Sequence, residues 1–178
     1  MTTVDSDGRA GSLRWQLRPG PGAWQILTLA GDVDENAELE ILVPRLRGKI
    51  EIDLAGISRI NSCGVRQWMH FLRELGSGVE LRFSRCSPAV VNQLNAIANF
   101  RGDASVTSFL SPYVCGTCGA DELRLLVVGV HFSLAPSTLR SLPEAPIFPC
   151  ERCNGAMTLD ELPDRYLTFL LELRDPHG

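Results

Sequence analysis

Two matched pairs of cysteines constrain this chain more than any other feature. Cys115 and Cys118 lie in the segment YVCGTCG, and Cys150 and Cys153 lie in FPCERCNG. In each Cys-x-x-Cys step a tight turn can direct two sulfurs at one ion, and a glycine within two residues of each pair can supply the positive φ of such a turn. Together the pairs predict one tetrahedral zinc site. Because thiolates would fill all four positions, the pattern favours a structural metal over a catalytic one.

The alternatives are two disulfide bonds or four unrelated buried thiols. Disulfides belong to oxidising compartments, and the first eight residues, MTTVDSDG, lack the basic and apolar regions of a secretory signal peptide. We therefore expect a cytoplasmic protein with reduced thiols and bound zinc. The longest apolar runs, such as 123–130, are too short to cross a bilayer, so we expect no membrane insertion.

Length and charge divide the chain into two parts. A chain of 178 residues can bury one core and add a small module held by a metal. Residues 1–111 contain twelve Lys and Arg against twelve Asp and Glu, whereas residues 112–178 contain five against nine, which accounts for the net charge of −4. Zinc ribbons often bind nucleic acid, but an acidic ribbon repels phosphates. We therefore expect no nucleic-acid partner.

Hydrophobic periodicity predicts alternating strands and helices before the first cysteine pair. Strands are expected at 13–17, 24–30, 50–54, 79–83 and 106–110, and helices at 36–47, from about 64 to 75 and at 88–100. This alternation is typical of an α/β layer structure.

The last segment predicts a helix with a wide apolar face. It starts near Asp160, with acidic residues in the first turn and Pro163 close to its beginning. The apolar face consists of Leu162, Tyr166, Phe169, Leu170 and Leu173. So wide a face needs cover, either from the rest of this chain or from a partner or a second copy.

Three stretches of the first part resemble a known family. They are LAGDVD at 29–34, IDLAGISRINSCGV at 52–65 and VELRF at 79–83. Over about residues 13–110 the chain is similar to the STAS domain, the fold of bacterial anti-sigma factor antagonists. The resemblance implies an α/β domain with a mixed sheet flanked by helices. We expect a disordered leader at 1–11, the STAS-like domain at 12–111 and a zinc-ribbon module with a C-terminal helix at 112–178.

The resemblance also implies a binding site in the loop between a central strand and the next helix. In antagonists that switch partners, the cognate anti-sigma kinase phosphorylates a Ser or Thr just before the glycine of this loop, and the phosphate blocks binding. The partner-binding residues implied here are Asn61, Ser62, Cys63, Gly64, Val65 and Arg66.

Two of these residues depart from the family pattern. Asn61 stands at an acidic position, and Cys63 stands at the position of the phosphate acceptor. A cysteine cannot serve as the usual acceptor, so we expect no phospho-switch there. Ser62 is a hydroxyl residue one position earlier, and its expected role is to cap the helix.

We interpret the chain as a non-catalytic regulatory module that binds another protein, such as an anti-sigma-type kinase. Its three histidines, His70, His131 and His177, form no catalytic pattern with serine and acidic residues, so we expect no enzyme. Two alternatives stay open. One is a redox sensor that uses Cys63 or the zinc thiolates. The other is binding of a small ligand, a nucleotide or a lipid, which is reported for some STAS domains.

Overall fold

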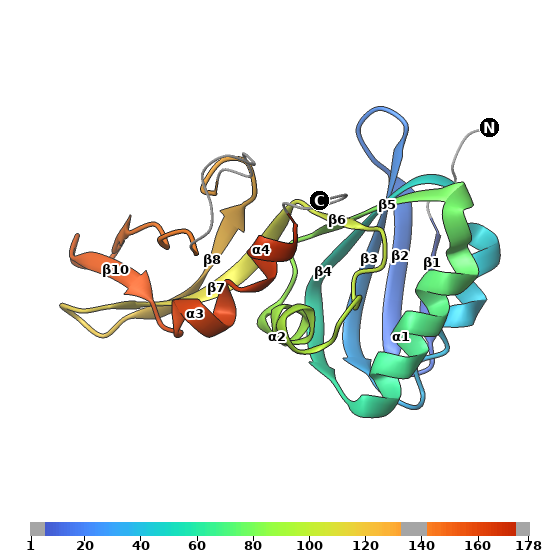
Figure 1. The fold of residues 1–178 in the computed structure, drawn as a ribbon, viewed down its shortest axis with the longest axis horizontal. Coiled ribbons are helices and arrows are strands. Elements are labelled where there is room, and N and C mark those ends of the chain that lie inside the picture. Colours follow the sequence, from blue (N-terminus) through green and yellow to red (C-terminus); the bar gives the residue numbers. More distant parts are fainter. Residues whose placement is uncertain (1–5, 133–141, 174–178) are drawn as a thin grey trace.

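The computed structural model describes residues 6–132 and 142–173. Within these ranges the chain forms two sheets, which lie next to each other along the long axis of the molecule (Figure 1). Sheet A has six strands in the order β1-β2-β3-β4-β5-β6, and sheet B has four in the order β8-β7-β10-β9. A mixed α/β sheet with a separate small antiparallel sheet confirms the fold class expected from the sequence. No helix in the described ranges is long and apolar enough to span a bilayer.

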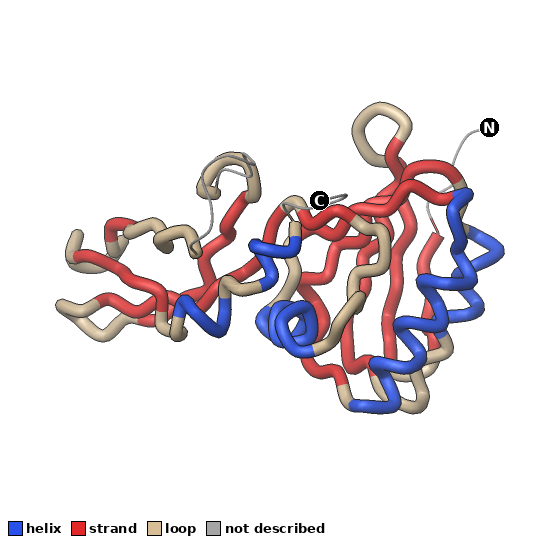
Figure 2. Tube along the Cα trace, viewed as in Figure 1, coloured by secondary structure: helices blue, strands red, loops and turns tan. Residues whose placement is uncertain are grey.

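Sheet A carries all of its helical connections on one face. Its strands are β1 (Ser6–Ala10), β2 (Leu13–Pro19), β3 (Trp24–Val33), β4 (Gly48–Ile60), β5 (Val79–Ser84) and β6 (Ser105–Val106). The connections between the parallel strands are η1 (Leu39–Arg45), α1 (Ser62–Leu75) followed by the turn η2 (Gly76–Gly78), and α2 (Pro88–Ala96). Each connection steps to the next strand in the same direction, and right-handed crossovers of this kind place their helices on the same face. Figure 2 shows α1 and α2 in front of the strands.

The core lies between this face and the helices. Leu27, Ile52 and Phe83 stand in register on β3, β4 and β5 and are fully buried. The Trp68 ring of α1 lies 5.5 Å from the Phe83 ring and 5.7 Å from the Phe100 ring, measured between centroids. The Trp68 indole N–H donates to the Phe100 carbonyl at 3.0 Å. Complete burial of one such side chain contributes about 1.5–3 kcal/mol, so this cluster holds α1 on the sheet.

Most of the predicted strands and helices of this part are present with shifted ends, but the strand expected at 106–110 is divided between β6 of sheet A and the start of β7 (Ser108–Cys115) of sheet B. The helix expected at 36–47 is a 3-10 helix of seven residues, and Pro44 inside it has no N–H to continue a regular ladder. The helix expected at 88–100 ends at Ala96. Strand β4 begins at Gly48, two residues before the expected range of 50–54, and continues to Ile60, six residues after it.

The expectation of a disordered leader at 1–11 is wrong for residues 6–10; residues 1–5 lie outside the described ranges. Strand β1 pairs with β2 in antiparallel register, from Ser6 opposite Leu17 to Ala10 opposite Leu13. Gly11 turns the chain with a φ of 61°, which favours glycine. The sequence signal was weak because an edge strand can consist largely of polar residues.

Sheet B is attached to sheet A by its strand β7. The sheet consists of β7 (Ser108–Cys115), β8 (Asp121–Val127), β9 (Phe148–Pro149) and β10 (Ala156–Leu159), all antiparallel. Strand β7 begins before the expected boundary at 112. At its start Cys86, which follows β5, donates its N–H to Ser108 and accepts the N–H of Leu110. The two parts of the chain therefore share a backbone ladder as well as a hydrophobic core.

The C-terminal segment packs on this junction. It forms two short helices, α3 (Pro163–Tyr166) and α4 (Phe169–Glu172), where the sequence predicted one. The side chain of Asn95 in α2 lies at the break, donating to the carbonyl of Tyr166 at 3.0 Å and accepting the N–H of Phe169 at 2.7 Å. The Phe169 ring meets the Phe109 ring edge-on at 5.0 Å.

This packing shows whether the C-terminal apolar face is covered by the chain itself or left open for a partner. Tyr166, Leu167, Phe169 and Leu170 are all buried, whereas Leu162 is 57% exposed. The chain itself covers most of the face, which confirms the first of the two expected arrangements. Tyr166 and Phe169 are therefore not free to bind a partner.

Candidate functional site

The structure brings the four predicted cysteines into one cluster. Cys115 ends β7 and Cys118 lies in the turn to β8, while Cys150 follows β9 and Cys153 lies in the turn to β10. Because β10 pairs with both β7 and β9, the two turns meet at one end of sheet B. The four sulfur atoms all lie within 4.8 Å of one another.

The spacing of the sulfurs fits a tetrahedral metal ion. The Sγ atoms of Cys115 and Cys153 are 3.5 Å apart, and those of Cys118 and Cys150 are 3.7 Å apart. Zinc–sulfur bonds of about 2.3 Å place tetrahedral sulfurs about 3.8 Å apart. All six cysteines are free thiols, which does not agree with the disulfide alternative. The cluster is thus compatible with a metal site of four sulfur ligands.

The two cysteine turns reach this geometry with different residues. Gly119 has a φ of 69° and donates its N–H to the Cys115 carbonyl at 3.0 Å. In the second turn Asn154 takes the left-handed conformation, with a φ of 57°, and donates to the Cys150 carbonyl at 2.8 Å. Asparagine tolerates this conformation better than most residues.

Gly155 has a different role from the one that the sequence indicated, because its φ is not positive. A Cβ atom at Gly155 would lie 2.5 Å from Oγ1 of Thr117 in the first turn. Glycine is therefore needed where the two cysteine turns approach each other.

The thiols of the cluster influence one another electrostatically. The N–H groups of Cys118 and Thr117 lower the pKa of the Cys115 thiol to about 6. The N–H of Gly155 acts to lower the pKa of Cys153, but the neighbouring sulfurs of Cys115 and Cys118 outweigh it and raise that pKa to about 12. Once one sulfur is ionised, ionising the next is opposed by like charge. A cation is required to hold four thiolates together.

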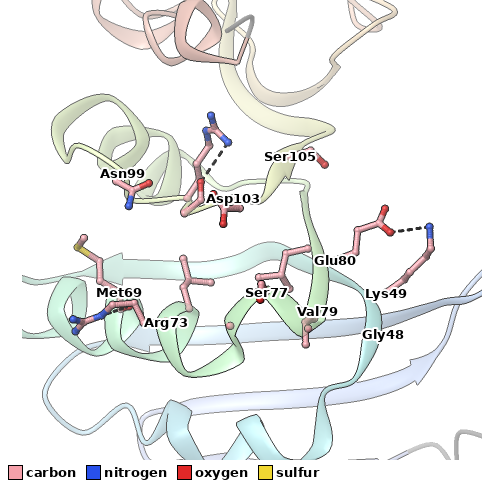
Figure 3. A pocket seen from close by; sticks show the side chains of 16 residues that line it. Gly48, Lys49, Met69, Arg73, Ser77, Val79, Glu80, Asn99, Asp103 and Ser105 are labelled. Carbon is pink, nitrogen blue, oxygen red and sulfur yellow. Dashed lines mark hydrogen bonds and ion pairs between the residues drawn. The ribbon is translucent and has the colours of Figure 1, made fainter. Parts of the chain in front are cut away.

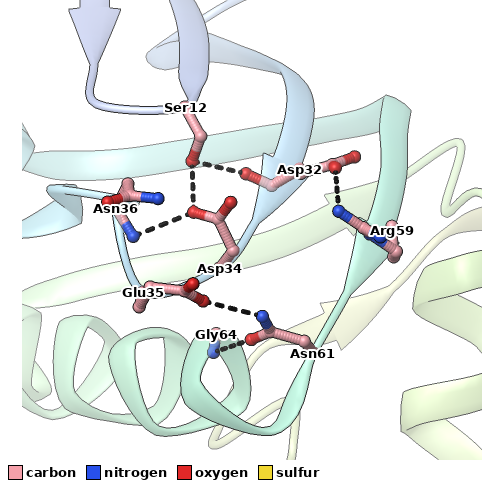
Figure 4. A network of polar contacts seen from close by, with 8 residues as sticks. All are labelled: Ser12, Asp32, Asp34, Glu35, Asn36, Arg59, Asn61 and Gly64. Atoms are coloured by element: carbon pink, nitrogen blue, oxygen red, sulfur yellow. Dashed lines mark hydrogen bonds and ion pairs between the residues drawn. The ribbon is translucent and has the colours of Figure 1, made fainter.

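The predicted partner-binding residues lie on sheet A, away from the cysteines (Figure 1). Strand β4 ends at Ile60, and α1 follows immediately. The cap of α1 is Asn61 and not Ser62, because Oδ1 of Asn61 accepts the N–H of Gly64 at 2.8 Å. Its Nδ2 donates to Glu35 at 2.9 Å (Figure 4). The Asn61 side chain thus fixes the loop from both sides.

Gly64 allows the loop to pack closely against the end of β3. It is buried, and a Cβ atom there would lie 1.8 Å from the carbonyl oxygen of Val33 at the end of β3. Around it Ser62 and Arg66 are exposed, whereas Asn61, Cys63 and Val65 are partly buried. The structure therefore gives Gly64 a positioning role and leaves the other five predicted residues accessible at the surface.

Acidic residues at the end of β3 lie beside the loop, and sequence reasoning assigned them no role. The Ser12 hydroxyl and the Asn36 N–H lower the pKa of Asp34, and the Asn61 amide lowers the pKa of Glu35. Figure 4 shows these contacts. Strands β3 and β4 are parallel, so the segments that follow them lie at the same edge of the sheet. The acidic residues directly after β3 were therefore the signal in the sequence that could have placed them beside the loop.

A groove of about 950 Å³ opens at the opposite end of the parallel strands (Figure 3). Its size lies in the range of small-ligand sites. Its cationic side chains already have partners: Lys49 pairs with Glu80 at 2.8 Å, Arg101 donates to the Ala104 carbonyl at 2.9 Å and Arg73 donates to the Met69 carbonyl at 3.3 Å. The groove therefore identifies no class of ligand.

Comparison of the chain with protein-family models, with curated proteins and with solved structures finds no match. The STAS resemblance stays a prediction from sequence.

Because Gly64 packs closely against the end of β3, adding a single methyl group at this position is expected to destabilise the protein strongly. We expect Gly64→Ala to lower the free energy of unfolding by at least about 2 kcal/mol, because the added Cβ must displace backbone. Gly78→Ala is the matched control, since a Cβ there meets nothing within 4 Å. Urea denaturation of both variants measures the difference. Equal stability would contradict the packing of α1 on β3.

Proposed function

We propose that this protein is a non-catalytic regulatory module of the STAS type, which binds another protein through residues Asn61–Arg66 and contains a structural zinc ion. The observation that carries the proposal is the loop geometry. Asn61 and Gly64 hold the loop rigidly against β3, while Ser62 and Arg66 remain exposed. Rigid, exposed loops at the ends of strands are well suited to hold a binding determinant.

The electrostatics of the loop support a protein partner. Arg59 pairs with Asp32 at 2.8 Å, and the Arg66 guanidinium donates to Cys63 Sγ at 3.3 Å. With Glu35 and Asp34 nearby, the surface presents both charge signs in a fixed arrangement, which is suited to the specific recognition of a charged protein surface. An anti-sigma-type kinase is the partner class that the family resemblance favours.

Cysteine at position 63 changes the regulation that the family resemblance implies. A thiol is not phosphorylated in the usual cycle, so binding through this loop is expected to be independent of phosphorylation. Adding negative charge at the same position would repel a partner that tolerates the cysteine side chain.

Zinc is the metal that the donor set favours. Four thiolates in tetrahedral geometry are typical of structural zinc, and they leave no open position for a water or a substrate. Cys115, Cys118, Cys150 and Cys153 would hold the ion, which joins the turn after β7 to the turn after β9. Strands β9 and β10 have only two and four residues, so they need this link.

The redox alternative has less support. Burial raises the pKa of the Cys86 thiol far above its ordinary value, which makes it unreactive. Outside the cysteine cluster a sensor would depend on Cys63 alone, which is a free thiol.

The metal assignment predicts about one zinc ion per chain in protein purified without added metal. We expect Cys118→Ser to abolish tight binding and to lower the free energy of unfolding by about 3 kcal/mol or more. Cys63→Ser is the control, because it changes a cysteine outside the cluster. Elemental analysis and denaturation measure both effects. Far less than one equivalent, with all four thiols open to titration, would refute the assignment.

The binding loop predicts that Cys63→Asp weakens the complex with a partner that co-purifies with the native protein. The expected loss of affinity is about tenfold or more, because the new carboxylate lies within the contact surface. Ser77→Asp adds the same charge in η2, beyond the C-terminal end of α1, and should bind normally. Calorimetry on the purified pair gives the affinities. If both variants bind like the unaltered protein, the contact lies elsewhere.

A further inference from the structure

Strand β8 forms an edge of sheet B with exposed apolar side chains. It pairs with β7 on one side, and no described strand pairs with its other side. Leu123 is 53% exposed and Leu125 is 44% exposed. An open edge with exposed leucines is the feature through which a sheet accepts another strand.

The backbone of β8 shows which residues face outward. Val128 donates its N–H to the carbonyl of Thr107, so the even-numbered residues of β8 point their hydrogen-bonding groups at β7. The odd-numbered residues point away from β7. At one of them, Val127, the outward N–H donates to Nδ1 of His131 at 2.8 Å. At Leu123 and Leu125 the outward groups have no partner within the described residues.

The leucines continue an apolar strip across the sheet. In the register of β7 and β8, Leu125 lies opposite Leu110, and Leu123 lies opposite Pro112. The strip therefore reaches the open edge.

We propose that β8 pairs with β8 of a second copy of this chain, in antiparallel orientation, with Leu123 on the twofold axis. This register places Glu122 opposite Arg124 of the second copy and, by symmetry, Arg124 opposite Glu122 of the second copy. Within one chain Glu122 and Arg124 already form an ion pair. The dimer joins the two pairs into a ring of alternating charges.

The charges select this register over its neighbours. With Arg124 on the axis, that residue would face itself, and with Glu122 on the axis two carboxylates would meet. Like charges directly opposite each other destabilise antiparallel strands. With Leu123 on the axis, the outward N–H and carbonyl groups of Leu123 and Leu125 find partners, and the two Leu123 side chains pack side by side.

The experiment is sedimentation equilibrium of the full, metal-containing chain. The unaltered protein is expected to form a dimer, and Glu122→Arg and Arg124→Glu are each expected to weaken it at least about tenfold, because each places like charges in opposition twice. Glu40→Arg, on the exposed side of η1, is the control for the change in charge and should not affect the dimer.

Mixing the two variants separates this interface from a loss of folding. The Glu122→Arg chain has two arginines flanking Leu123, and the Arg124→Glu chain has two glutamates there, so a heterodimer of the two restores both opposite-charge pairs. The mixture should therefore dimerise. Leu123→Pro removes one outward N–H without affecting the ladder to β7, and it should also abolish the dimer. Because Arg124 also donates to the Pro149 carbonyl at 3.3 Å within its own chain, circular dichroism first checks that both variants fold like the unaltered protein. An unaltered protein that stays monomeric at every concentration, or a mixture of two folded variants that fails to recover the dimer, would overturn the proposal.

Discussion

The crowding of four sulfur atoms within 4.8 Å is the constraint on which the smaller half of this protein depends. Two turns far apart in sequence supply the sulfurs, and their charges repel unless a cation neutralises them. The neighbouring secondary structure is too small to impose this proximity, since β9 and β10 contribute only short ladders. A metal ion bound by the four sulfurs would replace this repulsion with four metal–sulfur bonds.

The opposite end of sheet B is held by backbone pairing and by contacts between aromatic rings. Strand β7 joins the backbone after β5, and Phe109 contacts Phe132 and Phe169 in a shared aromatic core. The Asn95 side chain of α2 holds the C-terminal helices in place by bonding to the backbone carbonyl of Tyr166 and the backbone N–H of Phe169. The aromatic core therefore keeps sheet B beside sheet A, and a metal bound by the four cysteines would hold the two turns together at its far end. The aromatic core and the cysteine cluster both lie far from the loop that is proposed to bind a partner, so neither covers this loop.

Sequence reasoning found the features that depend on spacing and periodicity, and missed those that depend on tertiary contacts. The cysteine cluster followed from two Cys-x-x-Cys steps, and the strands and helices of sheet A from apolar periodicity. The cap at Asn61 depends on its contacts with Gly64 and Glu35, so Ser62 looked equally suitable. The break between α3 and α4 depends on Asn95, more than seventy positions earlier in the chain. The strand β1 was hidden because polar residues are sufficient at a sheet edge.

The central claim is that a metal held by four cysteines maintains sheet B. Hydrogen exchange followed by mass spectrometry, on the native protein and on protein stripped of metal under reducing conditions, tests it most directly. The account predicts that removing the metal abolishes the protection of backbone amides from exchange in the residues of β7, β8 and β10 next to the two cysteine turns. The amides of β3, β4 and β5 in sheet A should keep their protection. Unchanged protection of sheet B after complete removal of the metal would contradict the account.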